Sequence, residues 1–433
     1  MLYADHGSPK YFYDTIRPEA RDQWEVRRDR DLVVLSHPTV PDDPLVLHPA
    51  WLRDACTCGQ CVDPSSGQKR FATTDIPDRP RVLDAKKTSE GLLEVHWADD
   101  FLTSGTHISE YPASFTSDLF GHPDPSSALP AFKIWDRQDL EKLDPFFDYQ
   151  DFVGDGTNRS PQYYAAMTAL HTHGLFFLKN VPPSDVSVES IATRIGIIQE
   201  TFYGRLWEVV SKPDAENVAY TSSFLGLHQD LLYMTCPPRI QLLHCLENTC
   251  DGGESIFTDG RRVKAQIYSR FEDNEIRRLH HPVRYRYEKG GHSYTHRHPI
   301  LAVSKGHGVC WSPPFQHPEQ FQVKTESGQR KYQAWIRTVR RFKALLEAEE
   351  YSYVYKMKPG ECVIFDNLRL LHGRRQFDTS SGQRRLMGTY IDEGSYLSTL
   401  QSMKEQLTHH EGLSLDYQAE KLFTRHPGTA PKD

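Results

Sequence analysis

The sequence predicts a mainly β protein with some helices: a double-sheet jelly-roll core with helical inserts, preceded by a small β-rich N-terminal domain. Short strand-like segments dominate the chain from residue 217 onward, among them "IQLLHCL", "ESIFTD", "VRYRYE", "CVIFDN" and "RRLMGTYI". Only one long helical pattern interrupts them, over about 326–349. A stretch rich in Pro, Asp and Ser, over about 121–160, separates this region from an earlier part in which three cysteines crowd together.

Length and composition describe an ordinary globular protein. The 433 residues are enough for two or three domains, and 38% of them are hydrophobic and 25% charged. The formal charge of −7 gives no electrostatic reason to expect nucleic acid or an anionic membrane as a partner. No apolar run reaches the roughly 18–20 residues that span a bilayer, and the N-terminus has no signal or transit pattern. We therefore expect a cytoplasmic protein.

The predicted elements follow in order along the chain. Strand-like alternation over 32–48 and 91–97 belongs to an N-terminal domain, residues 1–120, and residues 121–160 form a linker. The jelly-roll domain then occupies 161–433. It opens with a helix that starts at Pro161 and stops near Gly174, followed by the core strand "LFFLKNV" and a helix over 187–199. Pro359-Gly360 predicts a hairpin turn between two of the last strands.

Cys56, Cys58 and Cys61 are spaced as metal ligands are. They offer three soft ligands, and a closed tetrahedral zinc site of the structural kind needs one more. His96 is one candidate for the fourth ligand, but it lies in the middle of a predicted strand. The alternative is three free thiols in a loop, which is uncommon at this density in a reducing compartment.

The stretch "GLHQDLLYM" (226–234) places His228 and Asp230 inside an apolar segment. On a strand, residues i and i+2 point to the same face. An unpaired buried carboxylate is costly, so Asp230 must have a partner. A His–Asp pair satisfied within a polar core is one interpretation, and a metal site is the other.

A second segment, "CVIFDNLRLLHGRR" (362–375), ends another apolar strand in His372. Two histidines and one carboxylate on one face form the facial triad that binds non-haem Fe(II). This arrangement leaves room for a bidentate co-substrate and for O2. Because His372 can supply the third ligand, the sequence favours a metal site over a simple His–Asp pair at His228 and Asp230.

A co-substrate such as 2-oxoglutarate also needs a cation for its distal carboxylate, preferably a bidentate arginine. In "RRLMGTYI" strand parity puts Arg384 and Tyr390 on one face and Arg385 on the other. We therefore choose Arg384 over Arg385, Arg374 and Arg375, although a bulge would exchange the first two.

These motifs resemble those of the taurine dioxygenase superfamily of Fe(II)/2-oxoglutarate-dependent oxygenases. The blocks "TFYGRLWEV", "ENVAYT", "LHQDLLY", "PPRIQLLHCL", "GGES" and "LLHGRR" are similar to its gamma-butyrobetaine dioxygenase branch and cover about 201–392 densely. The resemblance implies that His228, Asp230 and His372 bind iron and that Arg384 anchors 2-oxoglutarate. Ser255, in "GGES", stands where relatives place a hydroxyl near the co-substrate, although a simple turn hydroxyl fits equally well.

The same resemblance implies a trimethylammonium substrate. Such a cation cannot donate a strong N–H hydrogen bond, so aromatic faces must attract it. The positions that match the aromatic cage of the family are Tyr203, Trp207, Tyr220 and Tyr390. Asn217 matches a polar position that orients the substrate carboxylate. Because 11% of the residues are aromatic, an aromatic-rich core is the competing interpretation.

The N-terminal cysteine segment matches the family as well, and His107 in "THISEY" aligns with its fourth zinc ligand. The implied reaction converts gamma-butyrobetaine to L-carnitine, with stimulation by ascorbate, and the family includes homodimers. One departure concerns the substrate: Ser312-Pro313-Pro314-Phe315 stands where the animal enzymes have an Asn-rich stretch. The alternatives are trimethyllysine or an amino-acid-like substrate with the same mechanism, or a non-catalytic zinc-containing scaffold.

Overall fold

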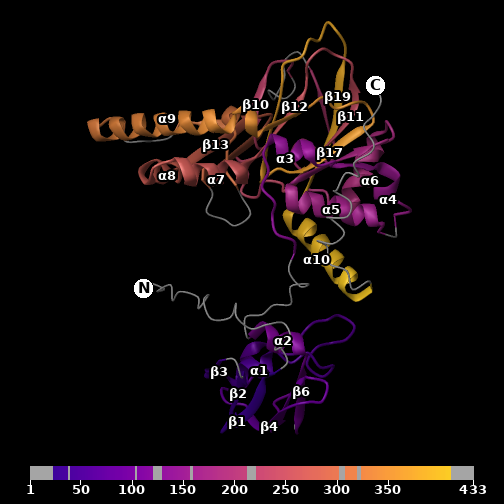
Figure 1. The fold of residues 1–433 in the computed structure, drawn as a ribbon, viewed down its shortest axis with the longest axis vertical. Helices are drawn as coiled ribbons and strands as arrows, with labels where there is room; N and C mark the ends of the chain where they lie inside the picture. Colours follow the sequence, from indigo (N-terminus) through magenta and orange to yellow (C-terminus); the bar gives the residue numbers. More distant parts are fainter. Residues whose placement is uncertain are drawn as a thin grey trace. The chain divides into compact units, whose positions relative to one another are not determined.

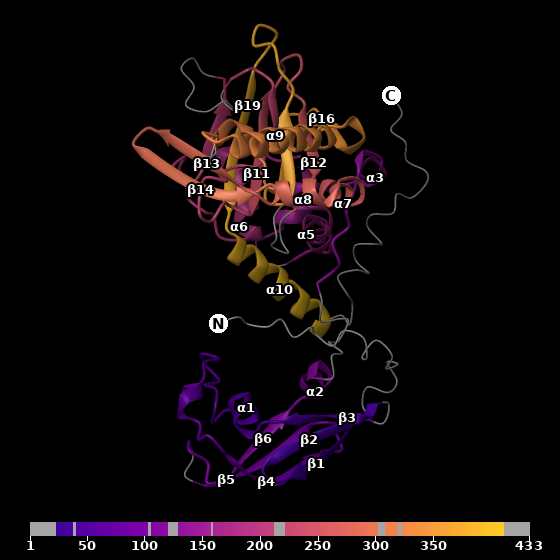
Figure 2. The ribbon, with the colours of Figure 1, turned by 90° about the vertical axis from the view of Figure 1, so that its left-hand side faces the viewer.

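The computed structural model describes residues 23–37, 40–102, 105–119, 129–156, 159–211, 221–301, 308–318 and 323–410. Contacts divide the chain into two compact units, Met1–Ala128 and Leu129–Asp433 (Figures 1 and 2). No helix in this described part of the chain has the length and apolar character needed to cross a membrane.

The described residues of the first unit form two three-stranded antiparallel sheets and two short α-helices. The first sheet is β1 (Glu25–Asp29), β2 (Leu32–His37) and β3 (Val40–Leu47), and the second is β4 (Arg81–Lys87), β5 (Leu93–Ala98) and β6 (His107–Tyr111). Helix α1 (Pro49–Asp54) follows β3, and α2 (Ala113–Leu119) follows β6.

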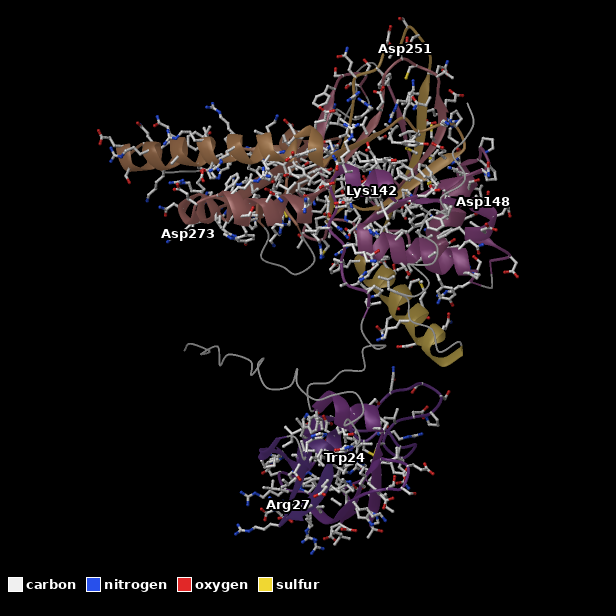
Figure 3. All side chains as sticks on the ribbon, viewed as in Figure 1. Trp24, Arg27, Lys142, Asp148, Asp251 and Asp273 are labelled. Atoms are coloured by element: carbon white, nitrogen blue, oxygen red, sulfur yellow. The ribbon has the colours of Figure 1, made fainter. Side chains whose placement is uncertain are left out.

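Strand β5 illustrates how the hydrophobic core of the first unit is built. Leu93, Val95 and Trp97 alternate inward as the sequence predicts, and they pack in one core with Trp24. Figure 3 labels Trp24 in the interior of this unit, whereas the side chain of Arg27 is exposed. The core is limited in size, which leaves a role for a stabilising metal.

The second unit is built on two sheets that face each other. The larger sheet contains, in spatial order, β7 (Phe146–Asp148), β8 (Leu175–Lys179), β17 (Glu361–Asp366), β11 (Ile240–Asn248), β19 (Arg384–Ile391) and β9 (Trp207–Val210). The smaller sheet contains β10 (Leu225–His228), β18 (Leu370–Arg374), β12 (Ser255–Asp259) and β16 (Ser352–Tyr355). Phe257 of the smaller sheet packs edge-on against Phe365 of the larger one, with ring centroids 5.5 Å apart.

Helices cover the other face of the larger sheet (Figure 1). Helix α5 (Pro161–His173) begins with Pro161 after the capping Ser160, and it ends at Gly174, whose φ of 88° is left-handed. It packs with α6 (Asp185–Ile195) and α10 (Glu393–His410) against the outward side chains of the sheet. The smaller helices α3 (Arg137–Lys142) and α4 (Tyr149–Val153) precede them.

An insert follows β12. It consists of α7 (Gly260–Arg270), α8 (Asp273–Leu279), β13 (Pro282–Lys289), β14 (His292–Pro299), β15 (Gln316–His317) and α9 (Glu326–Leu346). Helices α8 and α9 lie side by side (Figure 1). The long helix predicted over about 326–349 is present as α9. The second unit also contains helices that the sequence did not predict, such as α7 and α8.

The structure corrects two predictions about the chain path. Residues 129–156 are not a linker: β7 pairs in parallel with β8, and Trp135 is 1% exposed. The polar composition there reflects helix caps at Asp136 and Asp148 rather than an extended connection. Pro359-Gly360 joins β16 to β17, which belong to different sheets, so this turn is not a hairpin.

Candidate active site

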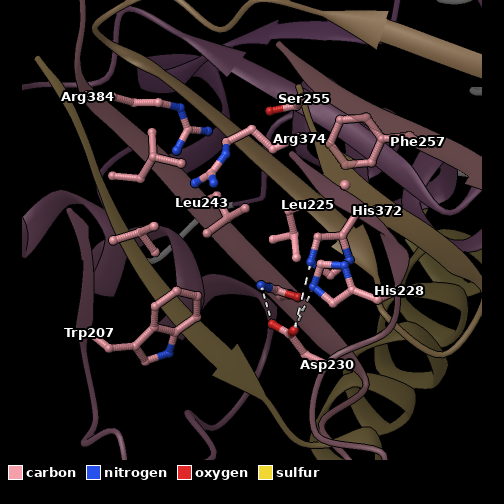
Figure 4. A pocket seen from close by; sticks show the side chains of 14 residues that line it. Trp207, Leu225, His228, Asp230, Leu243, Ser255, Phe257, His372, Arg374 and Arg384 are labelled. Atoms are coloured by element: carbon pink, nitrogen blue, oxygen red, sulfur yellow. Dashed lines mark hydrogen bonds and ion pairs between the residues drawn. The ribbon is translucent and has the colours of Figure 1, made fainter. Parts of the chain in front are cut away.

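A cavity lies between the two sheets of the second unit. Its lining residues are Trp207, Val209, Leu225, His228, Asp230, Gln241, Leu243, Ser255, Phe257, His372, Gly373, Arg374, Arg384 and Leu386. Figure 4 shows Arg374 and Arg384 towards one end, and His228, Asp230 and His372 towards the other. The cavity therefore joins a cationic end to an imidazole and carboxylate end.

His228 is the last residue of β10, and Asp230 lies in the turn that follows rather than on the strand. Leu231, directly after it, has a φ of 60°, which is unusual for a bulky side chain. This turn brings Oδ1 of Asp230 to 3.3 Å from Nε2 of His228. A turn thus brings His228 and Asp230 together. The prediction that both residues lie on one strand is wrong.

His372, on β18, is the direct cross-strand neighbour of His228. Its Nε2 lies 4.0 Å from Oδ1 of Asp230. The ligand atoms of these three residues all lie within 4.8 Å of one another, so one metal ion could contact all of them. Burial, then the charge of His228, lowers the pKa of His372 to about 3, so its imidazole is neutral. Burial alone would raise the pKa of Asp230, but the two histidines hold that pKa well below its usual range.

Neighbouring groups hold His228 and the backbone of Asp230, whereas Nδ1 of His372 is buried without a hydrogen-bond partner among the described residues. Nδ1 of His228 lies 2.9 Å from the carbonyl of Gly226, which can only accept, so Nδ1 donates this hydrogen bond and Nε2 is the nitrogen that faces the metal position. Asn367 accepts from the backbone N–H of Asp230 at 2.8 Å and donates to its carbonyl at 3.1 Å. The donor set, two imidazoles and one carboxylate, fits Fe(II).

Arg384 starts β19 and is 8% exposed. Its Nε is buried and has no hydrogen-bond partner among the described residues, and burial lowers its pKa. A buried guanidinium with an unused donor fits the carboxylate of 2-oxoglutarate. Ser255, which starts β12, lines the same cavity, whereas Arg385 forms an ion pair with Glu208 elsewhere.

Arg374 lines the cavity too, although strand parity favours Arg384. Its Nη2 donates to the carbonyls of Thr221 and Ser223, at 2.7 and 2.9 Å. Burial, then the charge of Arg384, lowers its pKa to about 10. Both arginines lie near the ring of Phe377, with guanidinium carbons 4.8 Å (Arg374) and 5.7 Å (Arg384) from its centroid.

Two of the four predicted cage residues meet beside the carboxylate of Asp230. The rings of Trp207 and Tyr390 have centroids 4.9 Å apart, and the Tyr390 hydroxyl donates to Oδ2 of Asp230 at 2.8 Å. Trp207 crosses Gly388, where a Cβ would come within 2.3 Å of the indole Cη2. The third residue, Tyr203, packs on Phe202 and lies close enough to Tyr233 and Tyr390 to raise the pKa of each. Neither Tyr203 nor Tyr390 is among the lining residues of the cavity. Asn217 and Tyr220 lie outside the described residues.

The predicted zinc ligands also lie together, in the first unit. Nε2 of His107 is 3.4, 3.7 and 3.6 Å from the sulfurs of Cys56, Cys58 and Cys61. A tetrahedral ion with the usual Zn–S and Zn–N bond lengths would separate these atoms by about 3.6 Å. Nδ1 of His107 donates to Gln60 at 3.1 Å, which leaves Nε2 for a metal. His96, the competing candidate, pairs with Glu94 instead.

Sequence reasoning missed two residues around Asp230. Gln241 donates from Nε2 to Oδ2 of Asp230 at 2.9 Å, and Asn367 holds the Asp230 backbone. The signal for Gln241 was visible: it is the single amide in the apolar strand "IQLLHCL". Asn367 follows the apolar strand "CVIFD", where a loop residue has no periodicity to mark it.

Two imidazoles, a carboxylate and a buried arginine in a cavity between facing sheets define the site of a 2-oxoglutarate-dependent Fe(II) oxygenase. Comparison with known proteins agrees. A family model described as "Taurine catabolism dioxygenase TauD, TfdA family" matches residues 140–390. The chain belongs to this TauD/TfdA family and is a 2-oxoglutarate-dependent dioxygenase.

Three curated relatives show how far the similarity extends. The chain is 34% identical to "Dioxygenase str8" of Strobilurus tenacellus over 370 residues, 79% of this chain and 81% of that one. It is 29% identical to gamma-butyrobetaine dioxygenase of Pseudomonas sp. (strain AK-1) over 362 residues, covering 82% and 89%. It is 26% identical to mitochondrial trimethyllysine dioxygenase of Mus musculus over 356 residues, covering 81% and 80%.

Proposed function

We propose that this dioxygenase hydroxylates an unactivated C–H bond of a trimethylammonium carboxylate, with gamma-butyrobetaine as the substrate and L-carnitine as the product. The observation that carries the proposal is the pair of aromatic faces, Trp207 and Tyr390, beside the carboxylate of Asp230. The similarity to gamma-butyrobetaine dioxygenase over 82% of the chain supports the same substrate class.

In this proposal His228, Asp230 and His372 hold Fe(II) in a double-stranded β-helix (jelly-roll) core. Bound iron supplies the oxidising chemistry, which uses O2 and converts 2-oxoglutarate to succinate and CO2. Arg384 binds the distal carboxylate of 2-oxoglutarate, and Ser255 donates a hydrogen bond to it. The protein thus contributes position and charge at the two ends of one cavity.

The substrate end depends on ring faces rather than on a carboxylate. A quaternary ammonium group has no N–H to donate, so a face of Trp207 or Tyr390 contributes about 0.5–2 kcal/mol of attraction. Gly388 allows the Trp207 indole to lie across β19, because any larger residue there would displace it. Apolar neighbours such as Leu225 and Leu243 keep this part of the cavity dry.

The test incubates the protein with Fe(II), 2-oxoglutarate and ascorbate, and with one of three compounds. These are gamma-butyrobetaine, trimethyllysine, and a carbon isostere of gamma-butyrobetaine in which tert-butyl replaces trimethylammonium. We expect succinate release coupled to gain of one oxygen atom by gamma-butyrobetaine. The isostere should react at least about tenfold less efficiently, because it lacks the charge that the rings attract. Equal succinate release with and without gamma-butyrobetaine would reject this substrate.

Trimethyllysine is the second candidate substrate, because of residues 312–315. Pro313–Phe315 forms a 3₁₀ turn, and the Phe315 ring packs on Tyr233 at 4.9 Å. Prolines offer no N–H and no amide side chain, so they cannot donate a hydrogen bond to a substrate carboxylate. Another part of the chain must supply that hydrogen bond. Preferential oxidation of trimethyllysine in the same assay would favour this candidate.

We further propose that Cys56, Cys58, Cys61 and His107 bind a structural Zn(II). All four positions of a tetrahedral ion would then be filled by protein, which leaves none open for chemistry. Arg53 donates from Nη1 to the Cys61 sulfur at 3.0 Å and forms a buried ion pair with Asp100 at 2.7 Å. This cation offsets part of the negative charge that three thiolates would bring.

A further inference from the structure

The two oxygens of the Asp230 carboxylate have different surroundings. Oδ1 faces Nε2 of His228 and of His372, at 3.3 and 4.0 Å. Oδ2 accepts two hydrogen bonds, from the Tyr390 hydroxyl at 2.8 Å and from Nε2 of Gln241 at 2.9 Å. One oxygen is therefore turned towards the metal position, and the other is held by the protein.

The two donors come from one place in the larger sheet. Gln241 on β11 and Tyr390 on β19 are direct cross-strand partners, so their side chains leave the sheet on the same face. Both residues are buried, at 2% and 3% exposure. A cross-strand pair inside a sheet is a rigid support, and Asn367 fixes the backbone of Asp230 from the other side.

The orientation of the Gln241 amide follows from its partner. An ionised carboxylate only accepts hydrogen bonds, so the NH2 group of Gln241 must face Asp230. Its Oε1 is then a buried acceptor that has no hydrogen-bond partner in the described part of the chain. A hydrophobic side chain would avoid this cost, so the amide is present for its donor.

We propose that Tyr390 and Gln241 act as positioning residues that restrict Asp230 to binding Fe(II) through Oδ1 alone. This inference rests on the proposed iron site. An octahedral ion has three positions left after two histidines and one oxygen, enough for bidentate 2-oxoglutarate and O2. A bidentate Asp230 would take one of these positions. Tyr390 and Gln241 therefore keep a position free for the co-substrate, and binding of the metal itself does not depend on them.

The proposal gives Tyr390 two separable functions. Its ring faces Trp207, where the substrate cation would lie, and its hydroxyl holds Oδ2 of Asp230. Tyr390→Phe keeps the ring and removes the hydroxyl. Gln241→Leu keeps the approximate volume and removes the amide donor.

The experiment measures anaerobic binding of Fe(II) by calorimetry, and then binding of 2-oxoglutarate to the Fe(II) protein by the visible absorption of the complex. In the Tyr390→Phe/Gln241→Leu double variant we expect unchanged Fe(II) stoichiometry and affinity, but at least about tenfold weaker 2-oxoglutarate binding. Tyr163→Phe is the control, because its buried hydroxyl donates to the carbonyl of Arg194 on the helix-covered side of the larger sheet. It should bind both like the wild type.

Wild-type 2-oxoglutarate affinity in the double variant would overturn the proposal. A loss of Fe(II) binding as large as that of His372→Ala would also overturn the proposal, because Tyr390 and Gln241 would then be needed for Asp230 to bind the metal at all. Absence of Fe(II) binding in the wild type is a different result, since it would reject the iron site itself.

Discussion

At the residue scale, the candidate site depends on which arginine enters the cavity. Arg384 is buried at the cationic end, whereas its neighbour Arg385 lies across from it on the other face of β19 and pairs with Glu208. Parity alone predicted this difference correctly, because the register shift opposite the start of β19 falls on β11, between Cys245 and Glu247. Arg374 lies on a different strand, and no pattern in the sequence indicates that it shares the cavity.

The first prediction compares these two neighbours. Arg384→Gln should raise the KM for 2-oxoglutarate by about two orders of magnitude, because it removes a charged partner in a buried site. Arg385→Gln should change the KM less than about twofold, since it removes only a partly exposed ion pair. Succinate formation at varied 2-oxoglutarate concentration measures both values. Similar effects from the two variants would contradict the assignment.

The second prediction concerns Trp207. Trp207→Leu should weaken binding of the trimethylammonium substrate at least about tenfold and leave the 2-oxoglutarate KM nearly unchanged, because only the cation needs a ring face. Trp207→Phe keeps a smaller face and should recover part of the loss. If Trp207→Leu raises both KM values together, Trp207 supports the fold instead.

At the element scale, β11 divides its side chains between two roles. Gln241 and Leu243 face the cavity, whereas Ile240 and Leu242 face the helices. His244 shares the helix-facing parity and is fully buried, and neither ring nitrogen has a hydrogen-bond partner in the described part of the chain. Such an unsatisfied group costs about 1–3 kcal/mol of stability.

His244 should therefore make the fold sensitive to acid. Burial lowers its pKa from the ordinary 6.5 to about 4. Below pH 6.5 the unfolded chain takes up a proton that the folded protein refuses, so stability falls as the pH drops from about 6.5 towards 4. His244→Leu should raise the melting temperature at neutral pH and by more at pH 5.

Thermal unfolding across that pH range checks this prediction. His292→Leu, at an exposed position of β14, is the matched control and should change the melting temperature at neutral pH only slightly. The account of β11 fails if His244→Leu lowers the melting temperature at pH 5.

The strands also show what the sequence could and could not predict. The sequence marked His228 and His372 because each was predicted to end an apolar strand. His228 does end β10, whereas His372 lies in the middle of β18, so its predicted place at a strand end is wrong. The cross-strand pair of Gln241 and Tyr390 was not predicted, because strand register is a long-range property. Residues 129–156 were mistaken for a linker because Asp and Pro mark helix caps as well as loops.

At the scale of the whole molecule, the chain has two units with separate candidate metal sites. The cysteine spacing predicted three ligands of the first site, and His107 came from family resemblance alone. His107 starts β6 and is 2% exposed. Apart from the resemblance, no feature of the sequence marks it as a metal ligand. The cytoplasmic location and a homodimer stay predictions.

Zinc removal should affect the two units differently. A zinc chelator should increase hydrogen exchange in β4, β5 and β6 much more than in α5 and β17, because the first unit has the smaller core. Cys58→Ser should have the same effect without chelator. Cys236→Ser, an exposed thiol in the second unit, should not. Unchanged exchange after complete zinc loss would contradict a structural role.

The central claim is that His228, Asp230 and His372 form the iron site that binds 2-oxoglutarate next to Arg384. The most direct measurement is anaerobic titration of the metal-free protein with Fe(II) and then 2-oxoglutarate. We expect one Fe(II) per chain at this site, followed by the visible absorption of its 2-oxoglutarate complex, and neither in His372→Ala. Full Fe(II) binding and the same absorption in His372→Ala would contradict the account.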